Sequence, residues 1–304
     1  METLVSLIFT TDFISSVIRV TTPILLATMA VLVSSRAGVL NISIEGTMLF
    51  SALMGVVGSS YTGSAWLGLL IAVISGVAFS YLLAFFHLRL KTDVILTGIA
   101  LNLFSSGFTV FLLFMLTGDK GVSTKLASKV LPNINIPFIE DIPVLGKIIS
   151  GQNFLTYAAV ISVIALHIFL RKTRTGTYIR AVGESPEAVA TAGKSVNNIR
   201  QTALLISGGL AGLGGAFMSM AYLSMFTKDM IAGRGFIALA AEAMGMSNPF
   251  LSFLASLLFG FADALSNNLQ LINIPSELTR VVPYLLTIIA LAIYAARAKA
   301  KSKS

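Results

Sequence analysis

The segment Arg171–Arg200, RKTRTGTYIRAVGESPEAVATAGKSVNNIR, is the longest strongly polar stretch between otherwise apolar runs. Ser185 followed by Pro186 is a helix start signal, and Glu187 then falls in the first turn, where the helix dipole favours an acid. Gly193 is well placed to end the helix after about two turns. The pattern predicts a short capped helix inside a polar loop. Two interpretations follow: a merely solvated loop, or a helix that docks into another protein.

The composition is that of an integral membrane protein. Of the 304 residues, 56% are hydrophobic and only 11% are charged, whereas soluble domains carry roughly 25% charged residues. The formal net charge of +8 is explained by Lys and Arg residues that flank the membrane. The chain has no cysteine, so disulfides, thiolate catalysis and cysteine metal sites are excluded.

Apolar runs of about the length that a membrane-crossing helix needs recur along the whole chain. One run is shorter and contains Gly245, so it is expected to be a short or broken crossing. We therefore expect an all-α, polytopic helical bundle of about nine transmembrane segments forming a single domain, 1–304. The expected segments are Phe13–Val33, Leu40–Ser60, Ala65–Phe86, Val94–Leu116, Phe154–Leu170, Thr202–Phe226, the short Phe236–Met246, Phe250–Leu271 and Val281–Ala296.

The basic residues predict the orientation in the membrane. The loop 171–200 and the tail 297–304 are rich in Lys and Arg, which places both in the cytoplasm by the positive-inside rule. The loop 117–153 is rich in proline and nearly balanced in charge, and we expect it outside. An odd number of crossings must then separate the loop 171–200 from the tail. The run 236–246 therefore counts as a crossing, and the N-terminus lies outside.

Polar residues inside the apolar runs are the candidates for a substrate path. Asn41 and Glu45 lie beside Gly38 and Gly46. Either Asn41 caps the second helix with Glu45 in its early turns, or the glycines break the helix in the membrane and both side chains face a polar cavity. Asn102, Glu242 and Asp263 also lie in apolar runs, where interhelical hydrogen bonds explain them as well as a substrate path does.

A glycine-rich stretch, SGGLAGLGGAF at 207–217, contains Gly208 and Gly212 in small-xxx-small spacing. This spacing lets two helix backbones approach closely, so helix packing is its expected role. The sequence contains no GxxxxGK[ST] phosphate-binding loop and no HExxH metal-binding motif, and it does not suggest a Ser/His/Asp catalytic triad. We therefore expect no enzyme activity, no cofactor and no metal site, and ATP hydrolysis would belong to another protein.

Several motifs resemble the permease subunits of bacterial ABC importers, in the branch that includes ribose-type and branched-chain amino-acid permeases. These motifs are GVLNISIEGTM at 38–48, RAVGESPEAVATAGKSVNNIR at 180–200 with the glycine-rich stretch, IAGRGFIALAA at 231–241 and the Asn-Pro pair at 248–249. The NIxxEG and GRGFIALA forms look most like the nucleoside (basic-membrane-protein-dependent) permeases. Ser43 departs from the commoner glycine form, and GMSNP lacks an aromatic residue, so the substrate remains open.

The resemblance implies a mechanism and partners. In this family a loop helix between the fifth and sixth spans docks into a groove of a cytoplasmic ABC ATPase, whose closure rocks two permeases between outward and inward openings. It also implies an external substrate-binding lipoprotein, a second and different permease, location in the bacterial plasma membrane and no nucleic-acid partner. Membrane lipid is a further expected partner of so apolar a chain. The expected coupling residues are Arg180, Glu184, Ser185, Pro186, Glu187, Ala188, Val189, Ala192, Gly193, Lys194 and Arg200, with Ala188, Val189 and Ala192 as apolar contacts.

The substrate path implied by these patterns includes Asn41, Glu45, Asn102, Glu242 and Asp263. Three alternatives to a nucleoside importer stay open: a permease for a sugar or branched-chain amino acid, an ion-coupled secondary transporter using acids such as Glu45 or Asp263, and a membrane scaffold without transport activity.

Overall fold

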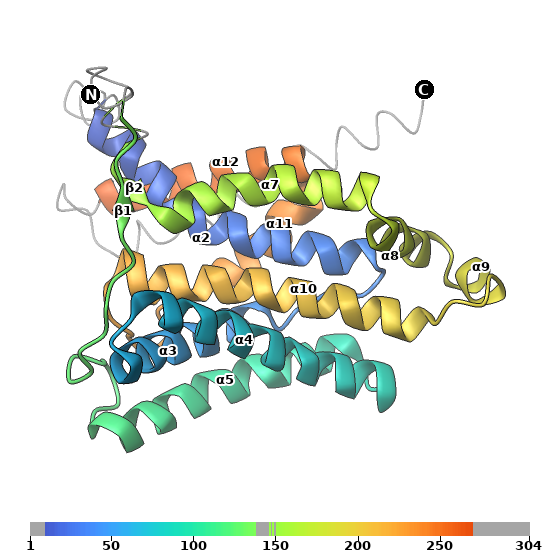
Figure 1. Ribbon diagram of the computed structural model, residues 1–304, viewed down its shortest axis with the longest axis horizontal. Helices are drawn as coiled ribbons and strands as arrows, with labels where there is room; N and C mark the ends of the chain where they lie inside the picture. Colours follow the sequence, from blue (N-terminus) through green and yellow to red (C-terminus); the bar gives the residue numbers. More distant parts are fainter. Residues whose placement is uncertain (1–9, 138–145, 147, 149, 270–304) are drawn as a thin grey trace.

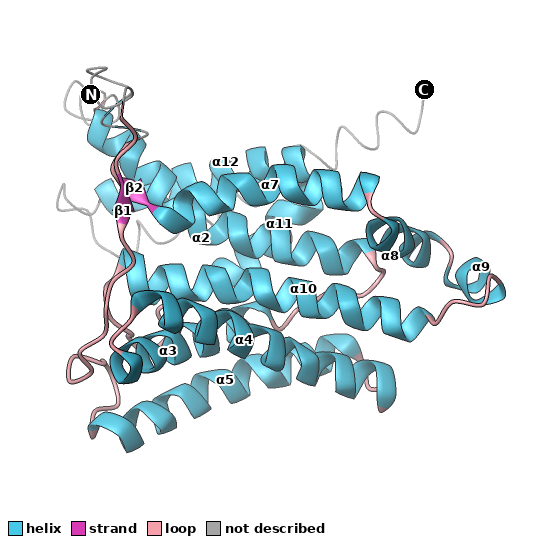
Figure 2. Ribbon diagram, viewed as in Figure 1, coloured by secondary structure: helices cyan, strands magenta, loops and turns pink. Residues whose placement is uncertain are grey.

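The computed structural model describes residues 10–137, 146, 148 and 150–269. Helices dominate this part of the chain (Figure 2). The α-helices are α2 (Thr11–Arg36), α3 (Ile44–Thr62), α4 (Ala65–Ala84), α5 (Val94–Thr117), α7 (Phe154–Lys172), α8 (Arg174–Glu184), α9 (Pro186–Thr191), α10 (Val196–Phe217), α11 (Arg234–Met244) and α12 (Pro249–Leu269). Two π-helical turns, η1 (Phe85–Arg89) and η2 (Met218–Tyr222), extend α4 and α10, and β1 (Asn133–Ile134) pairs with β2 (Gln152–Asn153).

The long helices run roughly parallel or antiparallel, with α2 and α10 in the middle of the bundle (Figure 1). Helices α3, α4 and α5 lie on one side of this pair, and α7, α11 and α12 lie on the other. Helices α8 and α9 project from one end, which we call the α9 end. The strands and the loop after α5 lie at the opposite end, which we call the loop end.

Six helices are long and apolar enough to cross a membrane: α2, α4 with η1, α5, α7, α10 with η2, and α12. The prediction of an apolar helical bundle is therefore confirmed. Helix α3 does not reach this level of hydropathy, and the predicted seventh segment, 236–246, corresponds to α11, which has only 11 residues. The predicted ninth segment, 281–296, lies outside the described residues. The number of nine crossings is not established by these helices.

The second segment does not begin where the sequence predicted. The expected helix started at Leu40, but residues 37–43 are non-helical and α3 begins only at Ile44. Gly38 has φ +72°, a left-handed conformation that glycine adopts without steric cost and that stops α2 from continuing. The chain thus leaves α2 at the α9 end and runs back into the bundle before α3 starts.

The glycine-rich part of α10 packs as predicted. A Cβ at Gly208 would lie 2.5 Å from the carbonyl oxygen of Gly76 on α4, and one at Gly212 would lie 2.9 Å from the carbonyl oxygen of Ala72. Only glycine permits these backbones to approach so closely. At these glycines the backbones of α4 and the central helix α10 are therefore in direct contact.

The loop end is held together by hydrogen bonds between distant segments. Ser123 donates its backbone N–H to the carbonyl of Phe226 (3.0 Å), and the N–H of Phe226 returns a bond to the Ser123 hydroxyl (2.8 Å). Backbone N–H groups of Gly121 and Val122 bind the Asp119 carboxylate and lower its pKa below the ordinary value. The loop after α5 is thus folded against the segment that precedes α11.

The polar segment 171–200 forms two helices where the sequence predicted one. Thr173 caps α8 by accepting the N–H of Gly176 (3.0 Å), and Ser185 caps α9 by accepting the N–H of Ala188 (3.4 Å). Gly193, with φ +73°, follows α9 as predicted. The expected helix, Glu184–Lys194, therefore corresponds to α9 and its caps, whereas Glu184 ends α8.

Candidate functional site

The break between α2 and α3 is tied down by Asn41, which is completely buried. Its amide nitrogen donates to the hydroxyls of Ser207 on α10 (3.0 Å) and Ser80 on α4 (3.4 Å), and its amide oxygen accepts the hydroxyl (2.8 Å) and the N–H of Ser43. Asn41 is not the N-cap residue of α3, which is Ser43. Its polar groups are satisfied inside the bundle, so its role here is to hold the non-helical segment in place.

Asn102 on α5 caps α3 from a neighbouring helix. Its amide oxygen accepts the N–H of Gly46 in the first turn of α3 (2.7 Å), and its amide nitrogen donates to the carbonyl of Ile42 (2.9 Å). Ser105, one turn further along α5, donates to the Gly46 carbonyl (2.7 Å). The first N–H groups of a helix have no partner within it, and the Ser43 side chain does not cap α3. Helix α5 therefore supplies the hydrogen-bond acceptor for this helix end.

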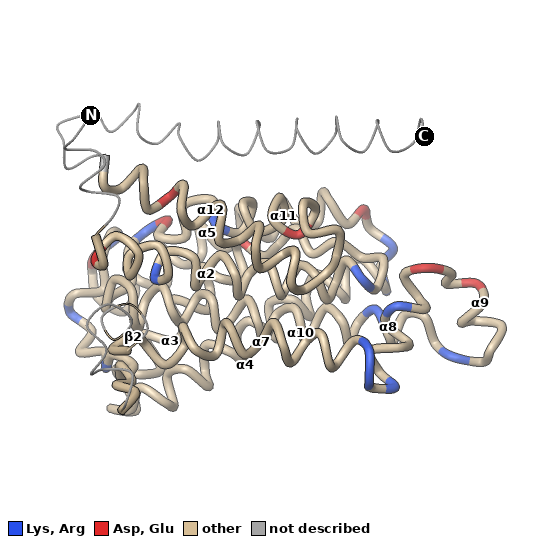
Figure 3. The backbone as a smooth tube through the Cα atoms, turned by 90° about the horizontal axis from the view of Figure 1, so that it is seen from above, with Lys and Arg blue, Asp and Glu red and all other residues tan. Residues whose placement is uncertain are grey.

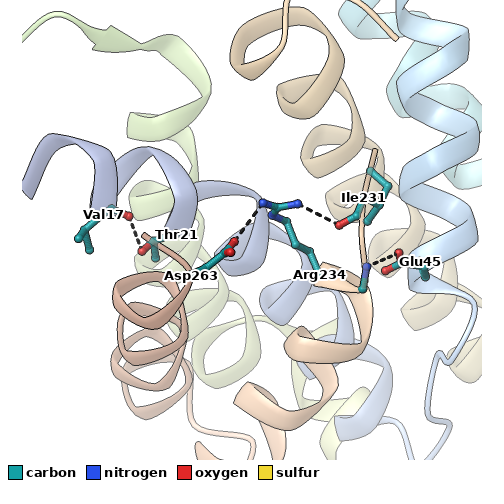
Figure 4. A network of polar contacts seen from close by, with 7 residues as sticks. Val17, Thr21, Glu45, Ile231, Arg234 and Asp263 are labelled. Carbon is teal, nitrogen blue, oxygen red and sulfur yellow. Dashed lines mark hydrogen bonds and ion pairs between the residues drawn. The ribbon is translucent and has the colours of Figure 1, made fainter. Parts of the chain in front are cut away.

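Glu45 in turn caps α11 from α3 (Figure 4). Its two carboxylate oxygens accept the N–H groups of Gly233 (2.8 Å) and Gly235 (2.7 Å). An acid at this position is favoured by the positive end of the helix dipole. A Cβ at Gly235 would lie 2.6 Å from the backbone nitrogen of Glu45, so the glycine is needed for this close approach. The beginnings of α3 and α11 therefore meet inside the bundle.

The first residue of α11 carries the ion pair described in this structure. Arg234 and Asp263 on α12 approach to 3.0 Å, with side chains 12% and 17% exposed. Another guanidinium nitrogen of Arg234 donates to the carbonyl of Ile231 (3.2 Å), while Nε is buried without a partner among the described residues (Figure 4). A basic residue at a helix N-terminus opposes the dipole. Glu45 and Asp263 offset this by placing two carboxylates around Arg234.

The segment before α11 adds a further acid to this group. Asp229 is exposed and accepts the hydroxyl of Ser106 on α5 (2.9 Å). Asp229 and Ala232 have φ values of +53° and +52°, which are uncommon for residues other than glycine. We call Glu45, Asn102, Asp229, Arg234 and Asp263 the polar cluster. It lies where α5 and α11 flank the beginning of α3, and it offers charged and amide groups within a largely apolar bundle.

The polar cluster does not include every predicted path residue. Asn41 bonds within the break, and Glu242 lies further along α11, where it accepts the hydroxyl of Ser247 (2.6 Å). The sequence reasoning missed Arg234 and Asp229 as members. Arg234 was visible in the GRGFIALA motif as a charge beside an apolar run. No cluster of three or more His, Cys, Asp or Glu side chains suited to a metal occurs in the described part of the chain.

Helix α9 is a second candidate site, since it projects from the bundle (Figure 1). Ala188 and Ala192 are exposed, as the predicted docking surface requires. Val189 is different: it is only 7% exposed, so it faces its own chain and is not available as a contact. Lys194 lies over the ring of Tyr178 on α8 (5.6 Å) and links the end of the loop to α8.

The predicted edge residues Arg180 and Arg200 bind the chain's own backbone. Arg180 Nε donates to the carbonyl of Leu170 at the end of α7 (2.9 Å), and Arg200 Nε donates to the carbonyl of Ala37 after α2 (3.3 Å). These bonds satisfy carbonyls that helix ends leave unpaired. The Arg180 bond thus connects α8 to the end of α7, and the Arg200 bond connects α10 to the beginning of the break.

Comparison with known proteins places these features in context. The chain is 35% identical to the guanosine ABC transporter permease protein NupQ of Bacillus subtilis, over 91% of this chain and 90% of that protein. It is 34% identical to the nucleoside ABC transporter permease protein NupC of Lactococcus lactis, over 94% and 92%. It is also 32% identical to TsgC13 of Haloferax volcanii, provisionally named as a glucose ABC transporter permease protein, over 88% and 80%.

The fold is similar to that of a solved ABC transporter in an inward-facing conformation, assigned to the metal-chelate type. The TM-score is 0.52, the sequence identity is 16%, and the match covers 92% of this chain and 84% of the other. The family model described as the permease component of branched-chain amino acid transport systems matches residues 13–291. With that match and relatives above 30% identity along most of their length, this multi-pass membrane protein belongs to the family of branched-chain amino acid transport system permease components.

Proposed function

We propose that this chain is the membrane-spanning subunit of an ATP-driven importer for nucleosides, with ATP hydrolysis carried out by a separate ATPase. The observation that carries the substrate assignment is the 34–35% identity, over more than nine-tenths of the chain, to relatives named for nucleosides and guanosine. The absence of a phosphate-binding loop from the full sequence agrees with a separate ATPase.

The polar cluster is the part of the bundle that best suits a substrate path. Nucleosides carry hydroxyls and ring nitrogens, and Asp229, Arg234 and Asn102 offer acceptors and donors for such groups. Transporters often form their sites where helices are interrupted, because helix ends there provide unpaired backbone groups. Here α3 and α11 both begin at the cluster, where Asn102 and Glu45 already bind their first N–H groups, so a substrate would meet side chains there instead of unpaired helix ends.

Helix α9 is the proposed contact with the ATPase. Ala188 and the C-cap residue Ala192 are small and exposed and would allow α9 to enter a groove closely, while Ser185 caps its beginning and Gly193 follows its end. Motion of α9 would reach the break through Arg200, which holds the Ala37 carbonyl. The basic residues concentrated near α8 support a cytoplasmic position for the α9 end, and Figure 3 shows them in blue at that end of the tube.

The proposed topology has nine crossings with the loop end outside. Helix α11 counts as one crossing together with residues 223–233, which run inward from the loop end, and 281–296 provides the last. Helix α5 is mostly exposed, with only 22% of its apolar window buried, and it flanks the polar cluster. This exposure suits a second permease, which we propose to be a different chain, and an external lipoprotein would deliver the substrate at the loop end.

The test is uptake of radiolabelled guanosine and uridine in a strain that lacks the gene for this chain, with and without the restored gene. The proposal requires that nucleoside uptake be lost on deletion and recovered on restoration. Glucose uptake serves as the comparison, because the 32% identical Haloferax volcanii relative favours a sugar as the second candidate substrate. Loss of glucose uptake with normal nucleoside uptake would replace the nucleoside assignment by that of a sugar.

A further inference from the structure

A small pocket of about 100 Å³ opens at the α9 end, where α2, α7, α8 and the beginning of α12 meet. Its polar lining comes from Arg36, His167, Arg171, Arg180, Ser247 and Asn248. None of these residues belongs to the polar cluster, and α9 does not line the pocket. We propose that this pocket binds a phosphate group, which the headgroup of an anionic phospholipid in the adjoining leaflet supplies.

The three arginines are positioned for an anion. Arg36 Nε donates to the Ser247 carbonyl (2.9 Å), and Arg180 Nε donates to the Leu170 carbonyl (2.9 Å). Each bond fixes one edge of a guanidinium group and leaves its terminal nitrogens without a partner in the described part of the chain. Arg171 is exposed and makes no polar contact with a described residue. Arginine forks of this kind match the oxygens of a phosphate group.

The pocket has no negative charge of its own. None of its lining residues is acidic, and the nearest acid through bonded groups is Glu242, whose carboxylate accepts the Ser247 hydroxyl (2.6 Å). Helix α12, with 21 residues, begins at Pro249 in the wall of the pocket, and Asn248 accepts the N–H of Phe250 (3.1 Å). A helix N-terminus adds positive potential to that of the arginines. An anion in the pocket would relieve the repulsion among these charges.

A phospholipid is favoured over free phosphate because an apolar surface adjoins the pocket. Ile164 and Ile168 on α7 are each 51% exposed, and Phe250 and Leu254 on α12 are 46% and 58% exposed. These side chains belong to two of the helices that line the pocket, and the ring of Phe250 lies against that of His167 in the pocket, with 4.8 Å between the ring centres. Acyl chains lie against such a surface while the phosphate reaches the arginines, and basic pockets between transmembrane helices bind anionic headgroups in this way.

Binding at this position would connect residues near the ends of α2 and α7 with α8. Arg36 is the last residue of α2 and immediately precedes the break, Arg171 is near the end of α7, and Arg180 is on α8. A phosphate group held by all three would restrain α8 relative to the transmembrane helices. We infer that an anionic lipid steadies the base from which α9 projects.

The test is native mass spectrometry of the full chain purified in detergent, with phosphatidylglycerol as the ligand and phosphatidylcholine as the zwitterionic comparison. Arg171→Gln removes one guanidinium that makes no described bond within the chain, so folding is not at risk. Loss of one charge-assisted contact predicts roughly tenfold weaker binding of phosphatidylglycerol. Lys172→Gln is the matched control: it removes the same charge from the next residue, which does not line the pocket.

Inorganic phosphate distinguishes the two sources of the ligand. If phosphatidylglycerol stays bound in the presence of millimolar phosphate, the lipid is the ligand. If inorganic phosphate binds without lipid, and Arg171→Gln weakens that binding, the site takes free phosphate. The proposal is overturned if neither ligand binds or if both variants weaken binding equally. It is also overturned if Arg171→Gln releases the ATPase from the complex while no phosphate ligand binds, because an acidic side chain of the partner would then occupy the pocket.

Discussion

Replacing Glu45 by glutamine tests whether one carboxylate holds the beginning of α11. Its oxygens accept the N–H groups of Gly233 (2.8 Å) and Gly235 (2.7 Å), and hydrogen bonds to a charged group contribute about 1.5–3 kcal/mol each. A glutamine keeps one neutral acceptor, worth about 1 kcal/mol, and turns an NH₂ group toward the other N–H. We expect Glu45→Gln to destabilise the protein by about 3 kcal/mol, since one buried N–H loses its partner.

The measurement is thermal unfolding of the purified full chain in detergent, compared at a fixed heating rate because membrane proteins often unfold irreversibly. A loss of about 3 kcal/mol predicts a midpoint lower by roughly 6 °C for a chain of this size. The unfolding midpoint of Glu45→Asp is expected to lie between those of the wild type and Glu45→Gln, because the shorter side chain does not reach both N–H groups. Glu187→Gln, an exposed change on α9, is the control and should change stability by less than about 0.5 kcal/mol.

Two results would refute this reasoning. A midpoint for Glu45→Gln equal to that of the wild type would mean that the carboxylate does not hold α11. Loss of nucleoside uptake at unchanged stability would assign Glu45 a direct role in substrate binding, instead of a role as a cap. The expected result is that uptake and stability fall together.

Three further predictions concern coupling, packing and orientation. Ala188→Glu should abolish co-purification of the ATPase at normal protein abundance, because an unpaired charge buried in a partner groove costs several kcal/mol; an unchanged complex would remove α9 from the mechanism. Gly208→Ala should destabilise the protein by about 1–3 kcal/mol in the same unfolding assay, because the new Cβ would lie 2.5 Å from a carbonyl oxygen. Gly209→Ala is the control and should be tolerated, because the nearest atom to its Cβ would be 3.5 Å away. Thr124→Cys should react with an impermeant thiol reagent in intact cells and Asn197→Cys should not; equal labelling of both would contradict the proposed orientation.

The features that the sequence predicted correctly depend on nearby residues. The cap at Ser185 and the end at Gly193 are set within one short segment, and the close packing at Gly208 follows from spacing along one helix. The apolar runs predicted most helices because a chain in lipid must satisfy its backbone hydrogen bonds within helices. Local rules are sufficient for such features, so they are visible in the sequence.

The features that were missed depend on partners far away in the chain. Asn102 bonds to a residue 56 positions earlier, and Glu45 bonds to one 188 positions later. Asn41 was interpreted as either a helix cap or a residue facing a polar cavity, whereas it bonds to Ser207 on α10 and Ser80 on α4. Only the tertiary structure shows that α5 caps α3 and that α3 caps α11. Helix α8, RTGTYIRAVGE, was missed because its polar composition was interpreted as loop, although its buried residues Gly176, Ile179 and Val182 recur at helical spacing.

The interhelical cap on α11 also has a consequence for biosynthesis. An α-helix of 11 residues is about 16 Å long, or roughly half the thickness of the hydrocarbon layer. As the chain emerges from the ribosome, α11 therefore cannot be stably inserted by its own hydrophobicity. Its partner, Glu45, is synthesised almost two hundred residues earlier, so the Glu45 side chain lacks these two hydrogen bonds until α11 has been made. Helix α11 thus completes the hydrogen bonding of Glu45 on α3 only late in synthesis. A chain truncated before Arg234 should therefore be recognised by membrane quality-control proteases.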